Sequence, residues 1–241
     1  MTPSPRIAGL SGILAGVGLA VEGTLWATSG WTAETFRDSA TALAFLQDNG
    51  THLRAAVFAG AANLVLATVF IVGLAARLGP TAPTRAAATL YLGIIGIAAH
   101  SLVPLGLWLG VPSFVDLAAS DPDAAAAAWS GYAAFQAGAG AVGALFLGLS
   151  TLAAGWAIIS QPGLPALLGG LGVLTGAASA VTVLTAETPL AVLAAGAYLP
   201  SLTLAIVFRT WAGVELWKGG KRPASQPGRP GGQTTAPTVG G

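Results

Sequence analysis

Five ionisable or amide side chains lie inside long apolar stretches of this sequence: Glu22, Asn63, His100, Gln136 and Arg209. A charged side chain at the centre of a bilayer costs about 2.5–3.5 kcal/mol on insertion scales, so each one needs a partner or a function. Histidine titrates near neutral pH and carboxyl groups accept protons, so Glu22 and His100 together have the chemistry of a proton site.

Helical rise places three of these residues at a similar depth. Glu22 lies six residues before Thr28, where the first apolar stretch is expected to end, which is about 9 Å along a helix. His100 and Gln136 also fall in the outer half of their stretches, and Asn63 lies nearer the middle. The sequence therefore predicts a ligand-binding site of Glu22, His100 and Gln136 with Asn63, taking a proton or a small solute whose identity stays open.

A purely structural use of the same side chains remains an alternative. A glutamate or glutamine near an interface can bridge neighbouring helices, and a lone histidine can bond a carbonyl of the next helix. Arg209 is interpreted as an anchor at the inner surface, because it stands near the end of its stretch. Under this alternative the protein is a structural or regulatory membrane subunit with no ligand.

The sequence lacks the motifs of the common enzyme and cofactor sites. It has no H-E-x-x-H, G-x-S-x-G, Walker or dinucleotide-binding pattern. With no cysteine and two histidines, it offers neither a thiolate site nor a His-rich metal site. A net charge of +1 without a basic patch argues against nucleic-acid binding. We therefore expect no catalytic residue, no metal and no cofactor.

The composition indicates that the elements positioning these residues are in lipid. Of 241 residues, 54% are hydrophobic and 8% are charged, whereas about a quarter are charged in soluble domains. Six runs are long enough to cross a bilayer as helices, at residues 7–28, 55–78, 86–109, 131–159, 164–184 and 190–211. A helix satisfies its own backbone within one segment. The prediction is an all-α polytopic membrane helix bundle with six transmembrane helices, forming one domain over residues 1–218.

The basic residues predict how the bundle is oriented. Eight of the ten Lys and Arg residues fall on the side of the N-terminus, and only Arg37 and Arg54 fall on the other side. The positive-inside rule then makes both termini cytoplasmic. The Arg-rich and Ala-rich composition is typical of bacteria, so the expected location is the bacterial inner membrane. The first run also resembles a signal peptide that would be cleaved after residues 27–29, but its length and Glu22 favour a retained span.

Three further segments have recognisable patterns. Residues 32–48 predict an amphipathic helix at the outer interface, and Asp121-Pro122 predicts a capped helix start. Pro104 lacks an N–H group, so a kink is expected beside His100. Residues 219–241 are rich in Gly, Pro, Ser and Thr and predict a disordered cytoplasmic tail.

Small residues repeat at four-residue spacing on several runs, in Gly12-x-x-x-Gly16, Ala56-x-x-x-Gly60 and Gly172-x-x-x-Gly176. This spacing puts small side chains on one helix face and allows close backbone approach. We expect the contacts to be mainly within the chain, although the same faces also allow a homodimer. Besides such a copy, the expected partner is the lipid bilayer.

Three stretches, in order along the chain, resemble a known pattern: Arg6-Ile7-Ala8-Gly9-Leu10, Gln161-Pro162-Gly163-Leu164-Pro165 and Glu215-Leu216-Trp217-Lys218. They resemble an uncharacterised bacterial family of six-span integral membrane proteins, a domain of unknown function with no assigned activity. The resemblance covers most of residues 6–220 and implies the six-span fold. Asn63 stands where the family has a polar or acidic residue, and Tyr132 stands where members often have a histidine.

Overall fold

The computed structural model describes residues 2–186 and 191–219, and this part of the chain is all-α. Its helices are α1 (Pro5–Ser29), α2 (Ala33–Arg37), α3 (Ser39–Leu78), α4 (Pro83–Ser120), α5 (Pro122–Ile159), α6 (Ala166–Thr185) and α7 (Ala191–Gly219). Five of them, α1 and α3–α6, are long and apolar enough to cross a membrane. The predicted all-α class is confirmed, and the five helices indicate a multi-pass membrane protein. All but the first residue of the predicted disordered tail lies outside the described residues.

The distribution of large and small side chains on α1 indicates whether the outer surface of the bundle faces water or lipid. Its large residues at helical spacing are exposed: Ile7, Leu10, Leu14, Val17 and Val21. Its small residues are buried instead: Ala8, Gly9, Gly12, Ala15 and Gly16. In water the large apolar side chains would be the buried ones, whereas in lipid close helix packing depends on small residues. This inverted pattern agrees with a lipid-facing bundle.

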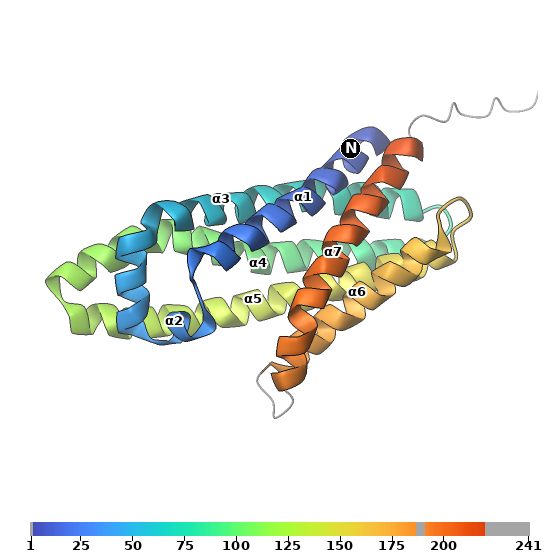
Figure 1. The fold of residues 1–241 in the computed structure, drawn as a ribbon. Coiled ribbons are helices and arrows are strands. Elements are labelled where there is room, and N and C mark those ends of the chain that lie inside the picture. Colours follow the sequence, from blue (N-terminus) through green and yellow to red (C-terminus); the bar gives the residue numbers. More distant parts are fainter. Residues whose placement is uncertain (1, 187–190, 220–241) are drawn as a thin grey trace, which may run out of the picture.

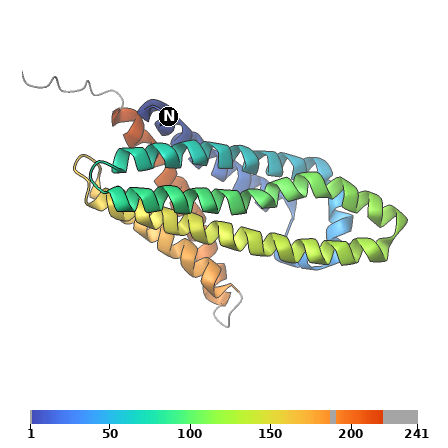
Figure 2. The ribbon, with the colours of Figure 1, turned by 180° about the vertical axis from the view of Figure 1, so that it is seen from behind.

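The six long helices close a ring in space (Figures 1 and 2). Each packs on two neighbours, in the order α1, α3, α4, α5, α6 and α7, and α7 returns to α1. The start of α1 and the end of α7 lie at the same end of the bundle, where Gly9 faces the backbone of Trp217. The short helix α2 lies at the opposite end.

The spacing of basic and aromatic residues along the antiparallel helices α3 and α4 can be compared with the thickness of a membrane.
Arg54 and Arg77 are 23 residues apart on α3, and Arg85 and Trp108 are 23 residues apart on α4. At 1.5 Å per residue each interval is about 35 Å, slightly more than a hydrocarbon core. Both helices therefore place a basic or aromatic residue at each expected interface.

The end of the bundle around α2 differs from the prediction. Residues 32–48 were expected to form one separate amphipathic helix, but they contain α2 and then the first turns of α3. The backbone of Asn49 is non-helical (φ −115°, ψ 17°), so α3 bends there before it enters the apolar run. Asp38 caps α3 by accepting a bond from the Thr41 N–H. Hydrogen bonds from the Thr41 side chain and backbone hold the pKa of Asp38 below its usual value.

Helices α4 and α5 are longer than the predicted spans 86–109 and 131–159. Each has 38 residues, and only Asp121 separates them. The predicted capped start is confirmed, because the Asp121 carboxylate accepts a bond from the Ala124 N–H at 3.0 Å. Residues 110–130 are thus helical, and their hairpin continues about 18 Å beyond the level of Trp108, since α4 has twelve more residues. Apolar run length predicted the lipid-facing part and missed this extension.

An aromatic cluster joins this hairpin to the α2 segment. Trp129 on α5 is fully buried, and its ring contacts those of Trp31, Phe36, Phe114 and Tyr132 at 5.4–6.2 Å between centroids. Its indole N–H donates to the Phe36 carbonyl oxygen at 3.1 Å. We call this set the aromatic cap, and it fixes α2 against the hairpin.

The two prolines of α4 do not end the helix. It continues through both Pro104 and Pro112, and the kink expected beside His100 stays a prediction. The non-helical break within a long helix occurs at Asn49 on α3, where no proline is present. Neighbouring helices support a proline-containing helix in a membrane bundle, so the missing hydrogen bond alone does not end it.

Glycines on α5 and α6 bring the backbones of these two helices into close contact. A Cβ on Gly155 would lie 2.6 Å from the Gly169 carbonyl oxygen, and one on Gly176 would lie 2.5 Å from the Gly148 carbonyl oxygen. On the other side of the ring, Gly12 lies against Gly213 of α7. The small-residue faces predicted from the sequence are therefore packed within the chain. A homodimer through them stays a prediction.

Gly155→Ala is expected to lower the free energy of unfolding by about 1–3 kcal/mol, because the new methyl group meets backbone atoms that have no room to move. Gly138→Ala on the same helix is the matched control, since a Cβ there would meet nothing within 4 Å. The control is expected to be neutral or stabilising by up to about 1 kcal/mol. Thermal unfolding of both variants in detergent checks this, and equal effects would contradict it.

Candidate functional site

A chain of three polar side chains crosses the bundle between α1, α3 and α7. The Asn63 amide on α3 donates to the Glu22 carboxylate on α1 at 3.0 Å. Its amide oxygen accepts a bond from the Arg209 guanidinium on α7 at 3.2 Å. The neutral amide thus contacts an acid with its donor side and a base with its acceptor side. We call these three residues the Glu–Asn–Arg relay.

Small residues make room for the relay. A Cβ on Gly60 would lie 2.7 Å from a carboxylate oxygen of Glu22, so the carboxylate rests on the backbone of α3 at that glycine. Gly18 of α1 faces Asn63 in the same way, at 3.6 Å from a built Cβ to the Asn63 Cβ. Asn63 itself is only 3% exposed. The Ala56-x-x-x-Gly60 pattern therefore supports a polar contact as well as helix packing.

Helix register shows how deep the relay lies. Asn63 comes nine residues after Arg54 and fourteen before Arg77, or about 14 Å and 21 Å along α3. Glu22 stands seven residues before the end of α1 at the α2 end of the bundle, and Arg209 stands ten residues before the end of α7 at the opposite end. The two long charged side chains thus extend toward Asn63 from opposite directions and meet well inside the apolar region.

The structure separates Gln136 from this relay. Gln136 on α5 donates to the Leu102 carbonyl oxygen at 3.2 Å and to the Tyr132 hydroxyl at 2.6 Å. It is 3% exposed, and its amide oxygen is buried and finds no hydrogen-bond partner in the described part of the chain. The sequence predicted one group of Glu22, His100 and Gln136 because they have similar depths. The structure does not bring Glu22 and Gln136 together, since Glu22 bonds Asn63, whereas Gln136 bonds Tyr132 of its own helix and Leu102 of α4.

His100 lies on the same α4–α5 interface as Gln136. Its backbone and Cβ pack on Gly143, where a built Cβ would lie 2.7 Å away. Its Nδ1 atom is buried and has no hydrogen-bond partner within residues 2–186 and 191–219. His100 and Gln136 thus both lie at the α4–α5 interface, apart from the relay.

Arg209 is the site residue that the sequence reasoning placed wrongly. It was interpreted as an inner surface anchor, but its guanidinium bonds Asn63 inside the bundle. The sequence carried a signal for this role, because Arg209 is the only basic residue within any of the six apolar runs apart from Arg77 near the end of its run. Farther along α7, Glu215 and Lys218 form a partly exposed ion pair with 2.8 Å between the Lys218 Nζ and a Glu215 carboxylate oxygen.

The relay offers proton and anion chemistry rather than metal chemistry. Among residues 2–186 and 191–219, no group of three or more His, Asp and Glu side chains is placed to hold a metal ion. Glu22 supplies a proton acceptor, and Arg209 supplies N–H donors of which one bonds Asn63. Protonation of Glu22 would change the net charge of the relay from zero to +1. Such a change inside an apolar region is energetically significant.

Comparisons with known proteins add no relative: no family model matches the chain, and no curated protein or solved structure is significantly similar to it.

Proposed function

We propose that this chain is a six-span membrane protein that binds and releases a proton at Glu22, within the Glu–Asn–Arg relay. The observation that carries the proposal is the carboxylate–amide–guanidinium contact between three helices at membrane depth. Ionisable residues inside membrane spans are rare, pair with one another and typically mark proton or solute pathways. The asparagine keeps the acid and the base one amide apart, so the carboxylate is held without a direct ion pair that would lock it in the charged form.

The membrane arrangement of the proposal has six spans, with α7 as the sixth. Residues 191–208 of α7 contain no charged side chain, and the helix packs on both α1 and α6. Arg6, Arg77, Arg85 and Lys218 belong to the same end of the ring, and Arg37 and Arg54 belong to the other end. This supports a cytoplasmic location for both termini and, with the composition, the bacterial inner membrane.

His100 and Gln136 are proposed as a second station for the proton or for a small polar solute. Each has a buried polar atom that bonds no other side chain or backbone group in the described part of the chain. Buried polar groups are normally hydrogen-bonded, so such atoms fit a place where a transient partner binds.

The test is proton flux through the purified full chain in liposomes that contain a pH-sensitive dye, driven by an imposed potential. The parent protein is expected to conduct protons, and Glu22→Gln is expected to reduce the flux by about 100-fold, as for the loss of a positioned acid–base group. Glu215→Gln is the matched control, because that carboxylate belongs to the partly exposed pair with Lys218. An inactive parent, or a Glu22→Gln variant with unchanged flux, would contradict the proposal.

Gly60→Ala is a second variant for the flux experiment, and it keeps all three side chains of the Glu–Asn–Arg relay. The added methyl group would displace the Glu22 carboxylate, which is the movable end of a flexible side chain, so the fold is expected to persist. We expect flux between those of the parent and Glu22→Gln. If both variants lower thermal stability and the parent has no flux, the structural-subunit alternative is supported instead.

A further inference from the structure

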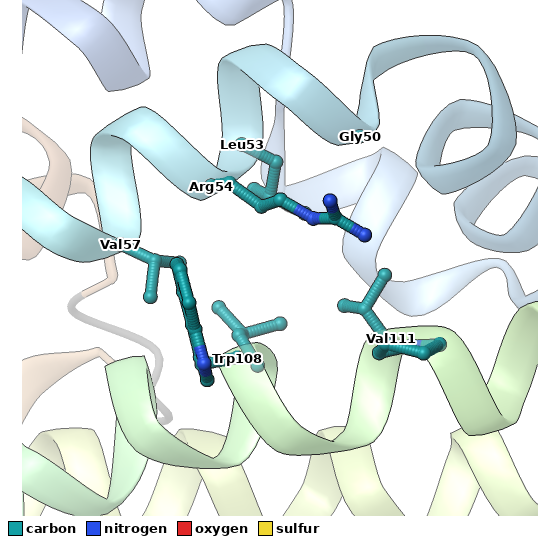
Figure 3. Close-up of a pocket in the computed structure, with 8 residues that line it drawn as sticks. Gly50, Leu53, Arg54, Val57, Trp108 and Val111 are labelled. Carbon is teal, nitrogen blue, oxygen red and sulfur yellow. The ribbon is translucent and has the colours of Figure 1, made fainter.

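A hollow at the bend of α3 lies between α3 and α4, away from the relay. It is lined by Gly50, Leu53, Arg54 and Val57 of α3 and by Leu107, Trp108, Val111 and Pro112 of α4 (Figure 3). All but one of the lining side chains that reach into it are apolar, and the exception is the Arg54 guanidinium. The hollow therefore combines one cation with an apolar wall.

Among residues 2–186 and 191–219, the Arg54 guanidinium has neither a hydrogen-bond partner nor an ion-pair partner. Asp48, which lines the adjoining open hollow, does not pair with it. Figure 3 shows the side chain extending from α3 across the gap toward Val111, with its charged end near the level of Gly50. Arg85 at the other end of the bundle differs, because it bonds the Ser160 hydroxyl at 2.9 Å and lies over the Trp156 ring.

The position of the hollow along the bundle matches that of a lipid headgroup. Arg54 and Trp108 stand at the end of the 35 Å intervals on α3 and α4, where the apolar surface meets water. Trp108 is 50% exposed, and Phe58, one residue after Val57, is 68% exposed. The Arg54 guanidinium is therefore at the expected level of the lipid phosphate groups. The apolar surface on the membrane side of it is at the expected level of the acyl chains.

We propose that this hollow binds a phospholipid, with its phosphodiester on Arg54 and an acyl chain along the half-exposed ring of Trp108. The proposal rests on the membrane placement given above and not on proton binding. A guanidinium suits this role because its planar N–H groups match two phosphate oxygens at once. The apolar wall distinguishes a lipid from a free phosphate ion, for which the α4 residues would offer no contact.

The experiment uses native mass spectrometry of the full chain in detergent with added phosphatidylglycerol. The parent is expected to retain one lipid more tightly than the rest, and Arg54→Gln is expected to weaken that binding by about fivefold, as for one basic residue at an anionic lipid surface. Arg37→Gln is the control, since it removes an equal charge at the same end of the bundle outside the hollow. Trp108→Ala is expected to weaken binding while leaving the charge unchanged.

Three outcomes would overturn the proposal: Arg54→Gln retaining lipid like the parent, both arginine variants losing it equally, or inorganic phosphate displacing it at millimolar concentration. A thermal shift on lipid addition, present in the parent and absent in Arg54→Gln, would support it and would show that the variant still folds. Because lipid retention is measured without a proton gradient, a negative result here is distinguishable from a failure of the proton proposal.

Discussion

Arg209→Met is expected to lower the free energy of unfolding by about 3–5 kcal/mol, the usual cost of leaving an opposite charge uncompensated inside a protein. The variant keeps the length and apolar stem of the side chain but leaves the Glu22 carboxylate without a balancing charge. It also leaves the Asn63 amide oxygen without its donor. SDS titration in mixed micelles measures the effect.

The double variant Glu22→Gln/Arg209→Met separates charge balance from packing. It removes both charges and keeps Asn63 able to bond the new amide, so we expect it to recover most of the stability lost in Arg209→Met. Lys218→Met is the control, because Lys218 pairs with Glu215 at a site where its side chain is 63% exposed, and the expected loss is below about 1 kcal/mol. A double variant as unstable as the single one would show that packing, not charge, holds Arg209 in place.

The sequence predicted the class and most helix positions because the signals are local. Apolar run length identifies a helix that crosses lipid, and Asp121 followed by proline identifies a helix start. The same signal missed the α4–α5 hairpin beyond the membrane, since residues 110–130 are too polar to count as a run and yet are held as helix by the aromatic cap. Helix continuity there depends on tertiary contacts, which run length does not measure.

The candidate site was predicted only in part, because residue counting gives the depth of a side chain in the membrane but not the neighbouring helix that it faces. Glu22, His100 and Gln136 have similar depths by this count, yet they face different helices. The ring order puts α3 and α7 beside α1, so Glu22 meets Asn63 and Arg209, and the α4–α5 interface takes His100 and Gln136. Arg209 was assigned to the surface because it stands two residues before the end of its predicted run, whereas α7 continues for ten residues beyond it and its guanidinium bonds Asn63.

Trp129→Ala is expected to cost about 3–5 kcal/mol, as for other fully buried large aromatic residues. The residue stands in the hairpin beyond the level of Trp108 and outside the predicted spans 86–109 and 131–159, so we expect its burial to gain from the hydrophobic effect. Phe135→Ala on the same helix is the matched control. Phe135 is 56% exposed on the apolar part of α5, where a lipid-facing ring gains little from burial, and we expect a loss below about 1 kcal/mol.

Trp129→Phe then isolates the hydrogen bond within the cap. It keeps an aromatic ring among Trp31, Phe36 and Phe114 but removes the N–H that bonds the Phe36 carbonyl oxygen, at an expected cost of about 1–3 kcal/mol. Limited proteolysis should detect the same change, since α2 is fixed to the hairpin through this residue, and cleavage near residues 30–38 is expected to speed up in the alanine variant. If proteolysis is unchanged and stability falls, the cap stabilises the hairpin alone, and α2 is held by its contacts with α3.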